Sequence, residues 1–185
     1  MNDLDKFIKD AVNGDVRAFE QIYKASASFV YNVAWSMLRN EHDAQEATQE
    51  VFMKVYKELK NFRFASSFKT WVYRITVNHV LNVRKSQSRY KNHEVMVEDE
   101  NVIDHISDHK EQNKEDEQEM IMKMLDILDP QQKMCMVLRH LEGLSYQQVA
   151  EVTRMNLNTV RTHLKRSREL LIKKFPRKEV IEHEM

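Results

Sequence analysis

Hydrophobic residues recur every three to four positions along most of this 185-residue chain, the period that places them on one face of an α-helix. The pattern predicts helices over residues 3–24, 25–39, 44–60, 70–85, 120–128 and 130–140, then a pair within residues 145–171. Asn-Gly-Asp at residues 13–15 divides the first span into two short helices. Two glycines and two prolines are too few for the turns of a strand-rich fold, so the expected fold class is all-α.

The helix predicted at 44–60 has the clearest division into two faces. Asp43 is expected to be its N-cap, with Glu46 at the third helical position. The polar face carries Gln45, Glu46, Gln49, Glu50, Met53 and Lys57. Judged by spacing alone, an ordinary solvated helix face is the plainer interpretation of this set.

Residues 144–166 predict two helices joined by a tight turn. Ser145 and Gln148 have the spacing of a capping box, and Asn156 or Asn158 can cap the second helix. Its apolar residues share one face, and the opposite face carries Arg161, Thr162, Lys165 and Arg166. Such donors suit phosphates and base edges in a major groove, so the stretch has the features of a helix-turn-helix with a basic recognition helix.

The charges are unevenly distributed although the formal net charge is zero. Residues 1–90 hold 14 basic and 10 acidic groups, residues 91–119 hold 3 and 11, and residues 120–185 hold 12 and 8. Within residues 154–178, nine basic groups face one acid, which favours contact with DNA over a merely solvated surface. Two mildly basic units therefore flank an acidic segment, whose few and irregular hydrophobic residues predict a flexible linker.

Residues 61–69 interrupt the helical period and predict a loop with three phenylalanines beside basic and small polar residues. Aromatic rings next to cations can stack on unpaired bases, although packing into a core is the commoner use of such rings. The helix that follows contains Asn78 and Asn82, which are unfavourable inside helices and call for another role.

Other candidate chemistry is sparse. His105 and His109 have the spacing of metal ligands on a helix but lack an evident third ligand, so we predict no metal site and no cofactor. The single cysteine, Cys135, lies among apolar residues, as is typical of a buried position. No nucleophile–base or paired-carboxylate constellation indicates an enzyme. The acidic amino terminus and the lack of a membrane-length apolar run predict a cytoplasmic protein without membrane insertion.

Four motifs, in this order, resemble those of the bacterial alternative sigma factors of the extracytoplasmic-function (ECF) group. Residues 13–19 (NGDVRAF) are similar to the start of the family's second conserved region, and residues 43–52 (DAQEATQEVF) to its signature helix. Residues 68–78 (FKTWVYRITVN) resemble the promoter-melting segment. Residues 141–146 (LEGLSY) resemble the approach to the fourth-region helix-turn-helix.

The resemblance implies a non-enzymatic, dissociable specificity subunit of RNA polymerase. It divides the chain into a region 2 domain (1–88), an acidic flexible linker (89–118), a region 4 domain with the helix-turn-helix (119–176) and a charged tail (177–185). The implied partners are core RNA polymerase, through its β′ clamp helices and β flap, promoter DNA and an anti-sigma factor. A conventional helix-turn-helix repressor or activator is the alternative, but it needs neither the aromatic-basic loop nor the Gln49-Glu50 pair.

The resemblance also assigns residues to each contact. The polymerase-binding residues would be Asp43, Gln45, Glu46, Gln49, Glu50 and Met53. The residues that capture a flipped base at the promoter −10 element would be Phe62, Arg63, Phe64, Ser67, Phe68, Lys69, Arg74 and Asn78. The residues at the −35 element would be Arg154, Arg161, Thr162, Lys165, Arg166 and Arg168. Arg154 stands where the family's turn usually has glycine, and its cation can add a phosphate contact.

Overall fold

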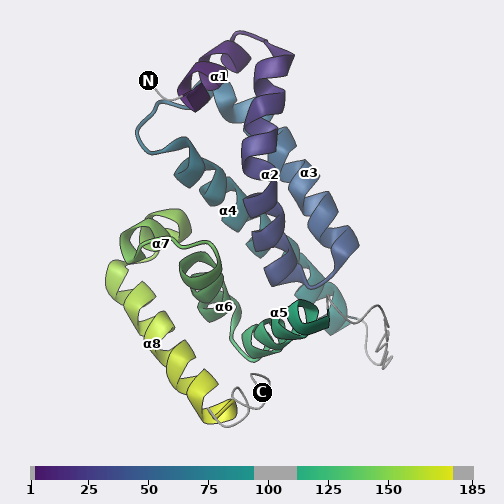
Figure 1. Ribbon diagram of the computed structural model, residues 1–185, viewed down its shortest axis with the longest axis vertical. Helices are drawn as coiled ribbons and strands as arrows, with labels where there is room; N and C mark the ends of the chain where they lie inside the picture. Colours follow the sequence, from purple (N-terminus) through teal and green to yellow (C-terminus); the bar gives the residue numbers. More distant parts are fainter. Residues whose placement is uncertain (1–2, 94–111, 177–185) are drawn as a thin grey trace.

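The computed structural model describes residues 3–93 and 112–176, which form helices and no strands (Figure 1). The first unit consists of α1 (Asp3–Val12), α2 (Val16–Leu38), α3 (Glu41–Glu58), the 3-10 turn η1 (Leu59–Asn61) and α4 (Phe68–His93). The second consists of α5 (Gln112–Asp126), α6 (Pro130–Met136), the π-helical turn η2 (Val137–Leu141), α7 (Tyr146–Thr153) and α8 (Leu157–Lys174). The predicted all-α class with a helix-turn-helix, α7 and α8, is confirmed. The central part of the predicted linker, with His105 and His109, and the predicted tail lie outside the described residues.

Side-chain caps begin several helices where the sequence indicates them. The Asp15 carboxylate accepts from the backbone N–H of Arg17, and Asp129 and Ser145 each form a complete capping box at the start of α6 and α7. The N-cap predicted for α3 was wrong. The Asn40 side chain accepts from the backbone N–H of Asp43 at 3.0 Å, so Asp43 lies within the first turn. There its charge favours the positive end of the helix dipole.

Three helices, α2, α4 and α5, are longer than the pattern predicted. Residues 16–24 are not a separate short helix but the beginning of the 23-residue α2, because the small residues at 25–28 include no helix breaker. Similarly, α4 begins at Phe68 rather than at Thr70 and continues to His93. No glycine or proline lies between residues 86 and 93 to end it. Helix α5 begins at Gln112 rather than at residue 120, so both ends of the predicted linker are partly helical.

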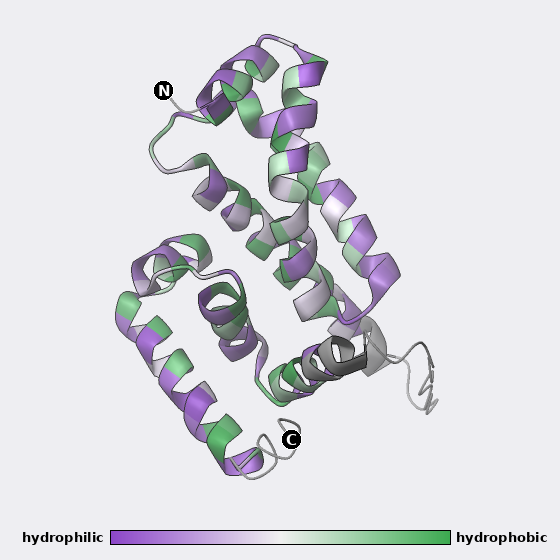
Figure 2. Ribbon diagram, viewed as in Figure 1, coloured by the Kyte–Doolittle hydropathy of each residue, from purple (hydrophilic) through white to green (hydrophobic). Residues whose placement is uncertain are grey.

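The first unit packs α2, α3 and α4 around a valine-rich core, and the apolar faces of these helices turn toward one another in Figure 2. Side chains with no exposed surface include Val30, Val33, Val51, Val55 and Val72. Tyr56 of α3 is 52% exposed and packs edge-on against the Phe19 ring at 4.9 Å between centroids. This core fixes which face of α3 and α4 is left for other contacts.

The second unit has its own buried side chains, and these join the buried side chains of the first unit in one contiguous hydrophobic cluster. The fully buried residues of the second unit include Met134, Val137, Leu138, Val149 and Val160. At the junction, the Asp126 carboxylate lies 3.3 Å from Nε of Arg39 at the end of α2 and 2.6 Å from Nζ of Lys133. Lys133 is 1% exposed, and burial lowers the pKa of its ammonium group. The two units are thus in direct contact.

The helix predicted to end near residue 140 ends in the π turn η2. Here the backbone N–H of Glu142 donates to the carbonyl of Val137, five residues back, at 3.0 Å. Gly143 follows with a φ of 73°, the left-handed conformation that glycine commonly adopts just past a helix end. The turn buries Leu138 completely and leaves Leu141 42% exposed. It sets the direction in which the chain leaves toward α7.

Candidate nucleic-acid interfaces

Helix α8 presents the basic surface that the sequence predicted. Asn156 rather than Asn158 is its N-cap and accepts from the backbone N–H of Asn158 at 2.9 Å. Val160 and Leu164 face inward, at 0% and 1% exposure. All six residues assigned to the −35 element are exposed: Arg154, Arg161, Thr162, Lys165, Arg166 and Arg168. Their donors can therefore reach phosphates and base edges without rearrangement of the helix.

The turn before α8 is built on an unusual backbone conformation. Arg154 ends α7 with φ 58° and ψ 25°, in the left-handed region that glycine adopts most easily. Arg154 is exposed in the turn between the two helices. Tyr146, near the start of α7, accepts a hydrogen bond from Arg168 of α8 at 2.7 Å through its phenol oxygen. This bond ties the recognition helix to the helix before it.

The aromatic-basic loop between η1 and α4 is ordered by its own rings. Phe62 packs against Phe64, Phe68 and Trp71, with centroid separations of 4.8, 5.5 and 5.2 Å. Phe64 is 49% exposed with φ 54°, whereas Phe68 is 5% exposed. An incoming base can therefore stack on the Phe64 ring, while Phe68 supports the loop from below. Arg63, Ser67 and Lys69 are exposed beside these rings.

A cavity of about 330 Å³ lies along α4 next to this loop. Its lining includes Lys54, Glu58, Trp71, Arg74, Asn78 and Asn82, together with Arg154 from the turn of the second unit. Asn78 is exposed to this space, so its amide can donate and accept hydrogen bonds there. Arg74 lies half-buried at the rim, and its guanidinium donates to Glu151 of α7 at 2.9 Å.

The outward face of α3 is polar, as predicted. Gln45, Glu46, Gln49, Glu50 and Met53 are exposed, and Asp43 is half-buried. The Asp43 carboxylate accepts from the Gln87 amide at 2.8 Å, which ties the start of α3 to α4. Met53, 57% exposed, provides an apolar contact in the middle of a polar surface. A partner with both apolar and hydrogen-bonding groups suits this combination.

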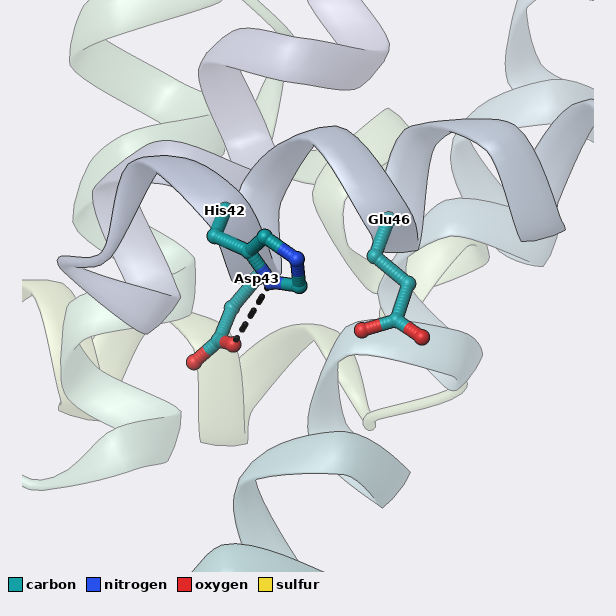
Figure 3. Close-up of side chains that lie close together, drawn as sticks. All are labelled: His42, Asp43 and Glu46. Atoms are coloured by element: carbon teal, nitrogen blue, oxygen red, sulfur yellow. Dashed lines mark ion pairs between the residues drawn. The ribbon is translucent and has the colours of Figure 1, made fainter.

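His42, Asp43 and Glu46 lie together in the first two turns of α3, with potential metal-ligand atoms within 4.8 Å of one another (Figure 3). Nδ1 of His42 is 3.9 Å from the Asp43 carboxylate. His42 and Glu46 are exposed, and the positive end of the helix dipole disfavours a cation at this position. We therefore interpret the group as part of the polar face of α3.

Sequence reasoning missed a polar cluster between α3 and α4. Nζ of Lys54 donates to Nδ1 of His79 at 2.7 Å, and Nε2 of His79 lies 3.6 Å from Glu50. Burial lowers the pKa of His79, and the Lys54 ammonium group lowers it further. His79 therefore links the polar face of α3 to the cavity beside Asn78. Twenty-five residues separate Lys54 from His79, so no local spacing signals the contact.

Two further buried groups, the Cys135 thiol and the Tyr73 phenol, stay protonated at neutral pH. Burial raises the pKa of the Cys135 thiol to about 11, which confirms the prediction of a buried cysteine and keeps the sulfur protonated at neutral pH. Burial also raises the pKa of Tyr73, with the Glu142 carboxylate adding to the effect. Tyr73 therefore acts as a hydrogen-bond donor, and its phenol donates to Glu142 at 2.7 Å.

Family comparisons agree with both halves of this architecture. Residues 22–90 match the family described as Sigma-70 region 2, and residues 118–171 match Sigma-70, region 4. The chain is 32% identical to the ECF RNA polymerase sigma-E factor of Haemophilus influenzae, covering 85% of this chain and 87% of that protein. It is 30% identical to the RNA polymerase sigma-H factor of Pseudomonas aeruginosa, covering 91% of each chain.

A third relative, the ECF RNA polymerase sigma factor SigE of Mycolicibacterium smegmatis, is 30% identical over 83% of this chain, which spans 60% of that protein's length. The fold resembles that of the sigma factor RpoE bound to the anti-sigma factor NepR from Bartonella quintana, with a TM-score of 0.68, 20% identity and coverage of 88% and 100% of the two chains. Within the described residues, no helix is long and apolar enough to cross a membrane. Helix arrangement, family matches and relatives agree: the chain belongs to the ECF group of the sigma-70 family of RNA polymerase sigma factors.

Proposed function

We propose that this protein binds core RNA polymerase and directs it to promoters, opens the promoter strands and starts transcription. The observation that carries the proposal is the presence in one chain of two different surfaces that are chemically suited to DNA. Helix α8 offers exposed cations and a hydroxyl to duplex DNA, while α4 and its loop offer an exposed ring and a cavity to an unpaired base. A conventional repressor needs only the first surface.

The −35 surface is the outward face of α8. Arg161 and Arg166 can each bond O6 and N7 of a guanine, and Thr162 can contact a base edge or a phosphate. Arg154 and Arg168 flank the helix and are suited to phosphates, which fix the position of the protein on the duplex. Asn158 holds the Arg161 guanidinium at 3.2 Å, which reduces the freedom that this side chain loses on binding.

The −10 surface is the loop before α4 and the cavity beside it. A base that leaves the helical stack loses a few kcal/mol of stacking and pairing. The Phe64 ring can replace part of the stacking, and the Asn78 amide can bond the base edge. Arg63, Lys69 and Arg74 can hold the phosphates of the same strand. This combination favours the unpaired strand over the duplex.

The polymerase contact is the outward face of α3, centred on Gln49, Glu50 and Met53. We propose that the β′ clamp helices bind here, that the β flap binds the second unit, and that the protein acts in the cytoplasm without enzymatic activity. An anti-sigma factor would control it in a stress response. The sigma factor RpoE that this fold resembles was solved in complex with the anti-sigma factor NepR.

Run-off transcription with core RNA polymerase and a promoter library tests the proposal. We expect initiation at a subset of promoters only when this protein is added. Asn78→Ala should reduce permanganate reactivity at the −10 element more than it reduces closed-complex binding, whereas Ser86→Ala, on an exposed part of the same helix, should change neither. Failure to bind core enzyme and to initiate at any promoter would refute the proposed function.

A further inference from the structure

Asn158, the second residue of α8, is held in place by three hydrogen bonds at the start of the recognition helix. Its backbone N–H donates to the Asn156 side chain at 2.9 Å, and its backbone carbonyl accepts from the Thr162 hydroxyl at 2.8 Å. Its side-chain oxygen, Oδ1, accepts from Nη1 of Arg161 at 3.2 Å. Asn158 is therefore fixed in backbone and side chain although it is exposed.

The bond to Arg161 determines how the Asn158 amide is oriented. A guanidinium group can only donate hydrogen bonds, so the amide atom that faces Arg161 must be the oxygen. The amide NH2 group lies on the other branch of the side chain. Within the described residues, no protein group accepts from it. Asn158 thus presents two N–H donors directed away from Arg161.

The spacing of Asn158 and Arg161 suits two neighbouring base pairs. Three residues along an α-helix correspond to about 4.5 Å along its axis and to adjacent positions on its surface. Successive base pairs of B-DNA are about 3.4 Å apart. Recognition helices place their N-terminal residues against base edges in the major groove. When Arg161 bonds a guanine, which is its proposed role in the −35 surface, Asn158 faces the next base pair.

A fixed donor at this place discriminates between the bases. In the major groove, guanine presents O6 and thymine presents O4, whereas adenine and cytosine present amino groups. Adenine offers only N7 as an acceptor, and cytosine offers none. The usual pairing of asparagine with adenine requires the amide oxygen to accept from N6, but here that oxygen already accepts from Arg161.

We propose that Asn158 is a specificity-determining residue of the −35 surface. Its NH2 group selects a keto base, guanine or thymine, in the base pair next to the guanine bonded by Arg161. The two side chains read neighbouring base pairs as one unit, because the bond between them fixes the orientation of the amide. This role rests on the proposed function of α8 at the −35 element.

The test uses holoenzyme assembled from the full chain and core RNA polymerase, with a pool of promoters randomised across the −35 element. The promoters that the holoenzyme retains are sequenced. Arg161→Ala identifies the base pair read by Arg161 as the position where the preference for guanine is lost. At one position beside it, the wild-type protein should prefer guanine or thymine over cytosine by about three- to tenfold, the contribution of one hydrogen bond.

Asn158→Asp is the decisive variant, because it keeps an oxygen toward Arg161 and replaces the NH2 donor with an acceptor. The preference for guanine should persist, and the preference beside it should shift to adenine and cytosine. Asn158→Ala should abolish the preference at this neighbouring position. Gln147→Glu makes the same change from amide to carboxylate at an exposed position on α7, and should weaken binding of all sequences alike without altering base preference.

An identical preference at the neighbouring position in the wild type and both Asn158 variants would overturn the role assigned to Asn158, while the −35 role of α8 would stand. Loss of this preference in both variants, without a shift to amino bases in Asn158→Asp, would overturn the donor readout. Failure of the wild-type holoenzyme to select any sequence in the −35 element would instead overturn the proposed −35 function, and the role of Asn158 with it.

Discussion

Replacing Arg154 with glycine should make the protein more stable and its DNA binding weaker. Arg154 has φ 58° and ψ 25°, a left-handed conformation that costs a residue with a Cβ atom about 1–2 kcal/mol. Glycine adopts it without this cost but loses about 0.5–1 kcal/mol through its greater freedom in the unfolded chain. The expected net gain is about 0.5–1 kcal/mol. For a chain of 185 residues this raises Tm by about 1–4 °C.

The same substitution removes a cation that we assign to a DNA phosphate. Each lost phosphate contact reduces the slope of log K against log salt concentration by about 0.9. Thermal unfolding followed by circular dichroism gives the first effect, and anisotropy titrations of a −35 duplex over a range of salt concentrations give the second. Arg154→Lys keeps both the charge and the left-handed backbone cost, so it is the matched control.

The predicted rise in Tm and the predicted fall in the salt slope can be contradicted separately. A glycine variant with unchanged or lower Tm would show that the left-handed backbone at this position carries no strain. A salt slope equal to that of the wild type would show that Arg154 contacts no phosphate. If Arg154→Lys shifts Tm as much as glycine does, the stability change comes from lost side-chain contacts rather than from the backbone.

Three further changes test the core, a titrating group and the recognition helix. Leu138→Ala should lower the free energy of unfolding in urea by about 2–5 kcal/mol, because Leu138 is fully buried. Leu141→Ala in the same π turn should lower it by less than about 1 kcal/mol, because Leu141 is exposed, and similar losses for the two variants would contradict this difference in burial. His79, with its pKa lowered from 6.5, stays neutral in the fold while the unfolded chain takes up a proton, so stability should fall as pH drops through about 6.5. His79→Gln should flatten that part of the curve of unfolding free energy against pH, and an unchanged curve would count against the buried neutral imidazole. Arg161→Ala should weaken −35 duplex binding by about 1–3 kcal/mol and leave binding to core polymerase unchanged, with Lys173→Ala as the control; loss of both activities would refute the assigned role.

Helical periodicity predicted which faces of α3 and α8 are exposed, because burial of one face in a three-helix packing or a helix-turn-helix leaves the opposite face to solvent. It could not choose between the two possible caps of α3. Asn40 and Asp43 can both accept from a backbone N–H three residues on, and only the extended backbone at Asn40 decides. It also could not reveal that α2 is continuous, because the small residues at 25–28 neither stop nor strongly favour a helix.

Contacts between distant segments were beyond the reach of the sequence pattern. Lys54 meets His79, and Tyr73 meets Glu142, only because of the way the helices pack. Phe68 illustrates the same limit within the candidate site. Its neighbours in the sequence suggest an exposed stacking ring, but the fold buries it against Phe62 and Trp71 and leaves Phe64 exposed instead.

The π turn at Val137–Leu141 has a consequence for changes in chain length. It holds one residue more than an α-helical turn, so deletion of one residue there can be absorbed by a return to α-helical hydrogen bonding. Every residue that follows would then turn by about 100° around the helix axis. Glu142 would leave Tyr73, and the whole helix-turn-helix would point elsewhere. A single deletion at this position would therefore change the orientation of α7 and α8 relative to α4 without unfolding them.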